Sequence, residues 1–439
     1  MTRKTTIRLA ALLALAPTTA ADIIDVPADW PMIQMAINAA NDGDEIVVQP
    51  GEYVEHLNLL GKEITIRSVD PLNPIIVDLT RVVGPAAAPR VQCVSGETAD
   101  TVLRGLTITH LSPAASDHGM HTYDSYPIVE YCVFLDNHSA DMGGGLLVGF
   151  PSIPVIRHCV FRGNSAVLGG GICVDWSNYV VIEDCTFEDN VASEDGGGVY
   201  LAECLCTTRR CSFDGNTADR GGGLFLNDVY EQNVVDECTF TSNNAFTNGG
   251  GAYIRRGDAW PLTSCVFEQN TAEKGAGLYT YQAIATISAC DFLGNIASNR
   301  GGGVYNNEST PTYVDCTFVG NDAGVDGGMR NWESQPIVVD CSFAGVDGDS
   351  SVDSMGGVTW QLTAPPITPP VMGACCLGSY CVVTTEGECV AAGGAYHGDY
   401  TTCADVTCPE DCLGDLNGDG VIGQADLGIL LSVYGQDCP

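Results

Sequence analysis

The sequence contains few positively charged residues and hardly any lysine. Its 439 residues include 18 lysines and arginines against 55 aspartates and glutamates, which gives a formal net charge of −37. Proteins that bind nucleic acid present a basic stripe to the phosphates, and this sequence has none. We therefore expect no nucleic-acid partner, and we interpret the acidity mainly as a means of keeping a long chain soluble.

Long apolar segments are also missing after the first residues. Residues 1–21 combine a basic start, an apolar run and small residues, which is typical of a secretory signal peptide. Removing this segment takes away three cations and no acid, so the net charge falls from −37 to −40. No later apolar run reaches the length of a membrane span. We expect a secreted or cell-surface protein without a membrane-spanning segment.

A repeat organises the middle of the chain. Cys-x-Phe occurs nine times at spacings of 25 to 27 residues, and in eight copies an asparagine follows the phenylalanine by three. The period overlaps that of leucine-rich repeats, but the units have neither a leucine frame nor a helical segment. Short alternating stretches separated by Asn, Asp and Gly instead predict the coils of a parallel β-helix. The copies begin at Cys132, Cys159, Cys185, Cys211, Cys238, Cys265, Cys290, Cys316 and Cys341.

Each position of the repeat predicts a column in a stacked coil. Cys and Phe are two residues apart in a strand, so both side chains should face the interior. The asparagines can form a ladder of side-chain amides, and the Gly triplets suit a bend where backbones approach closely. Because nine cysteines cannot pair systematically, we interpret them as a column of buried thiols.

Residues 26–68 predict a helix, a strand, a turn and a strand. Met32, Met35 and Ala36, with Ile33 and Ile37 beside them, form an apolar helix face that would cover the open end of the coil. This opening, the Cys-x-Phe-x-x-Asn units and the Gly-Gly-Gly-aliphatic-Tyr units together resemble the pectin-lyase-like superfamily, especially the repeats of polymorphic outer membrane proteins.

The resemblance covers about residues 22–360 and implies an all-β fold. That fold is a right-handed parallel β-helix, or solenoid, with an N-terminal capping helix. It implies no single activity, because the superfamily includes lyases, glycosidases, esterases and adhesins.

The C-terminal part of the chain changes in composition. Residues 361–372 are rich in proline and predict a semi-rigid linker. Eight cysteines follow between Cys375 and Cys438, an even number that indicates a disulfide framework of unknown connectivity in residues 373–411 and beyond. Zinc is the alternative, but neither a second histidine nor a paired CxxC spacing supports it.

Residues 415–426, DLNGDGVIGQAD, match a twelve-residue calcium loop. Gly420 would form its sharp turn, and water would fill position nine, which is Gly423. We expect Ca²⁺ to bind here. Residues 412–439 resemble a single dockerin repeat, which implies a cohesin-like partner or, equally, a surface-attachment role, since dockerins normally carry two repeats. The expected metal ligands are Asp415, Asn417, Asp419, Asp426 and the carbonyl of Val421.

An aromatic residue follows the Gly triplet in five consecutive units. Alternation places these rings on the outer face of the strand, one per coil, at a spacing close to the repeat of a sugar unit in an extended glycan. One interpretation is a platform on which sugar rings stack, and the other is that the rings only pack on one another. The rings are Tyr200, Phe225, Tyr253, Tyr279 and Tyr305.

Variable loops beyond the rings contain further candidate residues. In a lyase, Arg256 would serve as the base beside a calcium ion held by Asp258 and Asp228. Trp260 and Trp332 are candidate sugar contacts. The segment SDHGMHTYD, residues 116–124, lacks the Gly triplet and contains a histidine pair that could bind a metal or simply face solvent.

Two functions from different classes remain open at this point. The first is a surface-displayed carbohydrate-binding or structural protein without catalysis. The second is a secreted polysaccharide lyase or glycoside hydrolase. Regular units and the lack of a catalytic signature favour the first, with an extracellular polysaccharide as the expected partner.

Overall fold

The computed structural model describes residues 21–84, 89–110, 117–177, 179–229, 233–344, 352–354, 359–361, 372–377, 380–385, 389 and 395–399. The chain divides into two units, Met1–Gln361 and Leu362–Pro439, and each is described by itself. Among the described residues, no helix combines the length and apolar character needed to cross a membrane.

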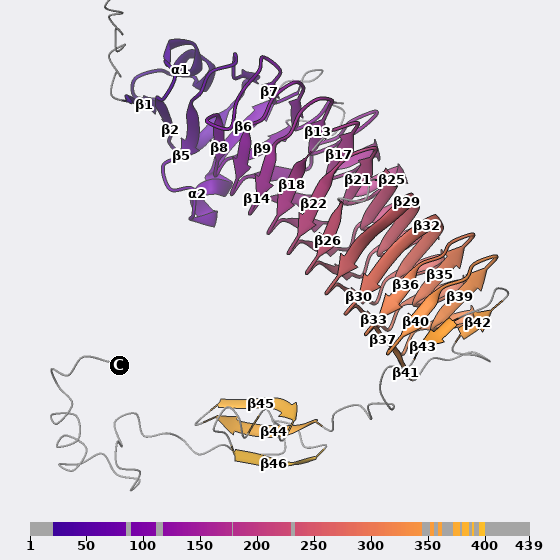
Figure 1. The fold of residues 1–439 in the computed structure, drawn as a ribbon. Coiled ribbons are helices and arrows are strands. Elements are labelled where there is room, and N and C mark those ends of the chain that lie inside the picture. The colour runs from indigo at the N-terminus through magenta and orange to yellow at the C-terminus, as the bar shows by residue number, and fades with distance from the viewer. Residues whose placement is uncertain are drawn as a thin grey trace, which may run out of the picture. The chain divides into compact units, whose positions relative to one another are not determined.

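The first unit is a right-handed parallel β-helix, as the repeat predicts (Figure 1). Its strands form sheets of 24, 12 and 7 strands. In each regular coil the chain passes through the 12-stranded sheet, the 7-stranded sheet and then two ladders of the 24-stranded sheet. We call these the post-glycine ladder and the pre-cysteine ladder, after the repeat positions beside which they lie.

The 12-stranded sheet carries the phenylalanines of the repeat, and the 7-stranded sheet follows the asparagines. The 12-stranded sheet consists of β3 (Gly51–Tyr53), β6 (Thr80–Gly84), β9 (Thr107–His110), β12 (Val133–Leu135), β15 (Val160–Arg162), β19 (Thr186–Glu188), β23 (Ser212–Asp214), β27 (Thr239–Thr241), β30 (Val266–Glu268), β33 (Asp291–Leu293), β37 (Thr317–Val319) and β41 (Ser342–Ala344). The 7-stranded sheet consists of β16 (Ser165–Leu168), β20 (Val191–Asp195), β24 (Thr217–Arg220), β28 (Asn244–Asn248), β31 (Thr271–Lys274), β34 (Ile296–Arg300) and β38 (Asp322–Val325).

The two ladders of the 24-stranded sheet share the long strands β29 (Ala252–Thr263) and β32 (Leu278–Ser288). The post-glycine ladder also contains β4 (Leu57–Asn58), β7 (Val91–Cys93), β10 (Met120–Thr122), β13 (Leu146–Val148), β17 (Ile172–Asp175), β21 (Val199–Ala202), β25 (Leu224–Val229), β35 (Val304–Asn307), β39 (Met329–Trp332) and β42 (Val352–Ser354). The pre-cysteine ladder also contains β1 (Ile23–Val26), β2 (Glu45–Val48), β5 (Thr65–Ser68), β8 (Val102–Arg104), β11 (Ile128–Glu130), β14 (Val155–Arg157), β18 (Val180–Glu183), β22 (Cys206–Arg209), β26 (Val234–Asp236), β36 (Thr312–Val314), β40 (Ile337–Val339) and β43 (Thr359–Gln361).

The repeat residues fill the interior. From Phe134 to Phe318 the phenylalanines of the Cys-x-Phe repeat are fully buried, and neighbouring rings along this column stack with centroids 4.6 to 5.1 Å apart. The predicted inward direction of Cys and Phe is therefore confirmed. The nine cysteines of the repeat are free thiols, as we expected from their odd number.

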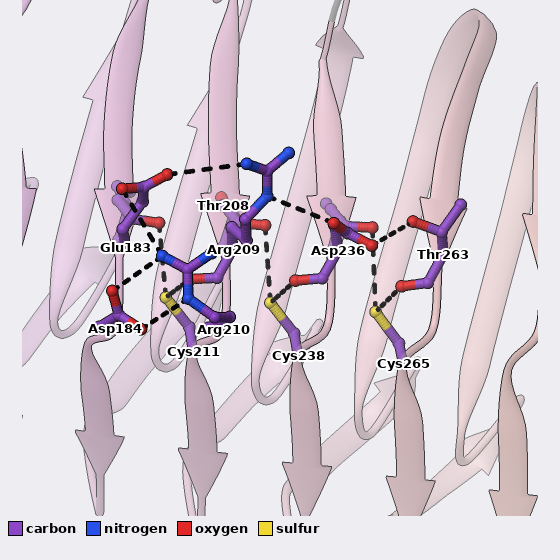
Figure 2. Close-up of polar contacts among 12 residues, drawn as sticks. Glu183, Asp184, Thr208, Arg209, Arg210, Cys211, Asp236, Cys238, Thr263 and Cys265 are labelled. Atoms are coloured by element: carbon purple, nitrogen blue, oxygen red, sulfur yellow. Dashed lines mark hydrogen bonds and ion pairs between the residues drawn. The ribbon is translucent and has the colours of Figure 1, made fainter. Parts of the chain in front are cut away.

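The thiols lie beside a charged column of the pre-cysteine ladder (Figure 2). Cys211 Sγ donates to the carbonyl of Arg209 at 3.3 Å, and other thiols of the repeat contact the carbonyl two residues earlier in the same way. Burial raises the pKa of the Cys211 thiol, so it stays neutral. On the outer face, the Arg209 guanidinium lies 4.0 Å from the carboxylate of Glu183 and 3.3 Å from that of Asp236.

The asparagines form the predicted ladder. Asn216 Oδ1 accepts from the backbone N–H and the side-chain amide of Asn190, both at 3.0 Å. Its Nδ2 donates to the carbonyl of Phe187 and to Asn243 Oδ1, both at 2.9 Å. Every asparagine of the ladder is fully buried, so these bonds replace all contact with water.

Two short helices lie near the N-terminal end of the β-helix, α1 (Ile33–Ala39) and α2 (Pro74–Leu79) (Figure 1). The carboxylate of Glu55 accepts the first two amides of α1, each at 2.8 Å. The helix buries Ile33 and Ile37 in the main core, whereas Met32 and Met35 are 38% and 42% exposed. The predicted methionine face is thus wrong, because helical periodicity places residues 33, 36 and 37 on one side.

The second unit contains a three-stranded antiparallel sheet. The strand β44 (Met372–Leu377) lies between β45 (Tyr380–Thr385) and β46 (Ala395–Asp399). The calcium loop and the dockerin-like segment lie outside the described residues. The calcium site and the disulfide framework therefore remain predictions from the sequence.

Candidate functional site

The five predicted rings lie in one column of the post-glycine ladder. Strand register aligns each ring with the next, from Tyr200 through Tyr305. The rings form a hydrophobic cluster separate from the main core, because alternation turns them away from the interior. We call these five residues the ring column.

The ring column is not the open platform that one interpretation of the sequence requires. Tyr200 is 9% exposed, Phe225 is fully buried and the remaining three rings are 5% exposed. Successive centroids are 4.8 to 5.4 Å apart, with interplanar angles of 4 to 19°. Parallel strands are spaced at about 4.8 Å, which leaves no gap between stacked rings. The rings therefore pack on one another, and stacking leaves no space for a sugar between them.

Two columns of mostly polar residues flank the rings. Arg220 CZ lies 5.5 Å from the centroid of Phe225, which shows that the end of the 7-stranded sheet reaches the ring column. Five residues before each ring, in register, are Asp195, Arg220, Asn248, Lys274 and Arg300. Two residues after each ring, in register, are Ala202, Asn227, Arg255, Tyr281 and Asn307, followed by Trp332. We call the ring column and these two columns the ring face.

The tyrosine hydroxyls connect the ring column to its flanks. Burial raises the pKa of Tyr253 to about 12, although Arg220 and Arg255 act in the opposite direction. Asn307 Nδ2 donates to the hydroxyl of Tyr279 at 3.0 Å. These phenols stay protonated at neutral pH, so the floor of the ring face is uncharged.

Several buried polar atoms of the ring face have no hydrogen-bond partner among the described residues. They are the Oδ1 atoms of Asn227, Asn248 and Asn307 and the Nε atom of Arg300. Leaving such an atom unpaired costs about 1 to 3 kcal/mol. All four atoms belong to the two flanking columns of the ring face.

The two flanking columns contain several positively charged residues, although the chain as a whole is acidic. Among the described residues, Arg255 and Arg300 form no ion pair, and Lys274 has only its neighbour Glu273, at 3.5 Å. Arg220 is neutralised by Asp195 at 2.7 Å. Three successive coils therefore present cations whose charge is largely available to an anion.

The residues proposed for a lyase are only partly brought together. Arg256 is half-exposed, adopts a positive φ of 52° within β29, and lies 3.7 Å from the carboxylate of Asp228. Asp258 and Trp260 belong to β29, but their side chains lie outside the described part of the structure. Trp332 packs against the ring column. Within the described residues, no group of three or more potential metal-binding side chains occurs.

The histidine pair lies on the post-glycine ladder before the ring column. The ring centroids of His118 and His121 are 5.6 Å apart, and His118 Nδ1 contacts the carbonyl of Gly143 at 3.0 Å. Burial lowers the pKa of His121, and His118 lowers it further. His121 is aligned with Leu147, and Leu147 with Cys173. Cys173 is in turn aligned with Tyr200, the first residue of the ring column.

The structure also contains a set of exposed aromatic residues outside the columns of the repeat. They lie in turns at the C-terminal ends of β10, β13 and β17, on three successive coils. Phe150 and Trp176 lie 26 residues apart, at equivalent positions of successive coils, but the equivalent positions in the coils before and after are Asp124 and Glu203, so no aromatic column runs along the repeat. A second sequence signal is that each aromatic residue lies within a turn-forming stretch. The residues, with exposures of 53, 53, 59 and 67%, are Tyr123, Phe150, Trp176 and Tyr179.

Comparison with family models agrees with the fold. Residues 92–259 match a family model described as a right-handed β-helix region. Three similar solved structures are tailspike protein 3 of bacteriophage CBA120, the A-module of the mannuronan C-5 epimerase AlgE6 of Azotobacter vinelandii, and the polygalacturonase of Erwinia carotovora. Their sequence identities are 11, 13 and 9%, and the TM-scores are 0.42, 0.42 and 0.36.

The matches cover 84, 76 and 78% of this chain and 61, 93 and 96% of those chains, respectively. The chain thus spans less than two thirds of the tailspike protein. No curated protein sequence matches it.

Proposed function

We propose that the ring face binds an extended acidic polysaccharide. The observation that supports this proposal is that the cations Arg255, Lys274 and Arg300 lie on successive coils on both sides of the ring column, beside amide side chains. Amide oxygens accept bonds from sugar hydroxyls, and guanidinium groups bind carboxylates in a fork.

The spacing of the coils favours a linear polymer over a small molecule. Each coil adds one residue to each flanking column at a rise of about 4.8 Å, close to the repeat of an extended glycan. A polymer lying along the ring face would meet Arg255, Lys274 and Arg300 on successive coils.

Replacing Arg255 and Arg300 by glutamine tests this function. Each removes a charged hydrogen-bond donor, worth about 1.5 to 3 kcal/mol, so each should weaken binding about tenfold or more. Titration calorimetry against polymers of uronic acids, sulfated sugars and neutral sugars would measure the affinities and show which anion is preferred. The matched control is Arg162→Gln, whose exposed side chain pairs with Glu188 on the 12-stranded sheet.

The outcomes are distinguishable. Binding of the acidic polymer should also weaken as salt is added, because the contact is ionic. Equal affinity of the parent and both variants, or an equal loss in the Arg162 control, would show that the ring face is not the binding surface.

A polysaccharide lyase or glycoside hydrolase is the second candidate. It is favoured by the position of Arg256 and Asp228, which lie together next to the flanking residues Arg255 and Asn227. Scoring the same incubations for new reducing or unsaturated ends separates this function from binding alone.

We further propose that the protein is secreted or held at a cell surface. This rests on the sequence of residues 1–21 and on the dockerin-like segment, which would attach the chain to a cohesin-like or other anchoring partner. The N-terminal helix α1 would then protect the first coil from edge-to-edge association.

Calcium is expected to order the C-terminal segment. Asp415→Ala removes the first ligand of the loop, so it should abolish binding of one Ca²⁺ ion to the full chain. Because metal binding and folding are coupled in small modules, chelation should make residues 412–439 more sensitive to protease. The β-helix should resist digestion with or without calcium. Unchanged digestion and no binding heat up to millimolar calcium would contradict the prediction.

A further inference from the structure

The exposed aromatic turns differ from the ring column in one respect that matters for binding. Tyr123, Phe150 and Trp176 are 53 to 59% exposed, whereas the rings of the ring column are at most 9% exposed. None of the three stacks on another aromatic ring among the described residues. Their ring faces are therefore open to a ligand, which those of the ring column are not.

The three residues follow one another along the axis of the β-helix. The register of β10, β13 and β17 aligns Thr122 with Val148 and Val148 with Val174, so the turns that follow are stacked coil on coil. The Tyr123 ring approaches the next coil, because a Cβ atom on Gly149 would lie 3.6 Å from it. The absence of a side chain at Gly149 leaves room beside this ring.

Polar groups without partners accompany these rings. Asp175 directly precedes Trp176, and burial together with Glu203 raises its pKa. Neither Asp175 nor His121 has a hydrogen-bond partner among the described residues. The empty side-chain position of Gly149 lies 3.7 Å from His121 Nε2. A carboxylate and an imidazole beside open rings are suited to receive sugar hydroxyls while the apolar face of the sugar covers a ring.

We propose that Tyr123, Phe150 and Trp176 form a second glycan site that stacks uncharged pyranose units. The acids nearby, Asp175 and Glu203, disfavour anionic sugars here, in contrast to the cations of the ring face. The proposal rests on the proposed function in that both surfaces bind glycans. The two surfaces nevertheless differ in the charge of the sugar that they accept.

Neutral oligosaccharides test this site separately from the ring face. Titration calorimetry of the full chain with oligomers of glucose, mannose, xylose and galactose should detect binding of at least one of them. Trp176→Ala should weaken that binding about fivefold to tenfold, as expected for loss of one aromatic stacking contact. Phe150→Ala should act in the same direction. The matched control is Phe246→Ala, since Phe246 is 68% exposed but lies on β28 of the 7-stranded sheet.

Each result is decisive. If Trp176→Ala binds as tightly as the parent, or if no neutral oligosaccharide binds, the second site does not exist. If sedimentation shows that the parent self-associates and Trp176→Ala does not, the rings are a protein contact and the proposal fails. Loss of acidic-polymer binding in Arg255→Gln with neutral binding intact supports two separate sites. Neutral binding that needs Trp176, without any binding of acidic polymers, would overturn only the function proposed for the ring face.

Discussion

Asn216→Ala is expected to lower the free energy of unfolding of the β-helix by about 3 kcal/mol. The substitution removes the acceptor for two donors of Asn190 and the donor to the carbonyl of Phe187. These groups are buried, so water cannot replace the lost bonds without opening the coil. Urea unfolding followed by far-ultraviolet circular dichroism measures the change as a lower midpoint.

The control for this prediction is Asn299→Ala. Asn299 also donates a side-chain bond, to Glu273 at 3.1 Å, but the contact is exposed. Its loss should change stability by less than about 0.5 kcal/mol. Equal midpoints for the two variants would mean that the buried ladder contributes no more than a surface contact.

Gly223→Ala is expected to destabilise the β-helix by about 2 to 3 kcal/mol, because the added methyl group overfills a tight contact between coils. A Cβ atom at this position would lie 2.6 Å from the carbonyl oxygen of Gly251 and 3.0 Å from the ring of Phe240. Neither neighbour can yield without moving the next coil. The measurement is the same urea midpoint.

The natural control is the middle glycine of a triplet. Gly250→Ala should cost less than Gly223→Ala, although a Cβ there would also meet backbone oxygens, at 2.4 and 2.6 Å. The reason is that Ala276 already occupies the middle position in the following coil and packs in a small cluster with Ala245 and Ala272. If Gly250→Ala lowered the urea midpoint more than Gly223→Ala, the alanine at position 276 would be tolerated because of its own coil, and not because the middle position of every triplet accepts a methyl group.

Periodic features of the structure could be predicted because each of them is repeated nine or eight times in the sequence. The inward Cys and Phe columns and the asparagine ladder depend only on strand alternation and a common period. One unit alone would not distinguish a coil of a β-helix from an ordinary hairpin. Nine units at nearly constant spacing exclude that alternative.

The burial of the ring column could not be predicted in the same way. Alternation shows that Tyr253 points away from the core, but it does not show that the end of the 7-stranded sheet lies beside it. That contact depends on the bend after Asn248 and on Arg220 reaching Phe225. The exposed aromatic turns could not be predicted for a different reason: Phe150 and Trp176 share one repeat position on only two successive coils, whereas the ring column extends over five.

The regular coil also sets how the molecule can change in length. Every column advances by one residue per coil, and the strand pairings of a coil join it to the coils directly before and after it. Deleting or duplicating one unit of 25 to 27 residues would therefore place side by side two coils whose strands can pair in the same register. On the ring face such an event would shorten or lengthen the proposed glycan track by one sugar-sized step. The length of the ring face can thus change in evolution by whole coils, and no single contact between coils needs to change.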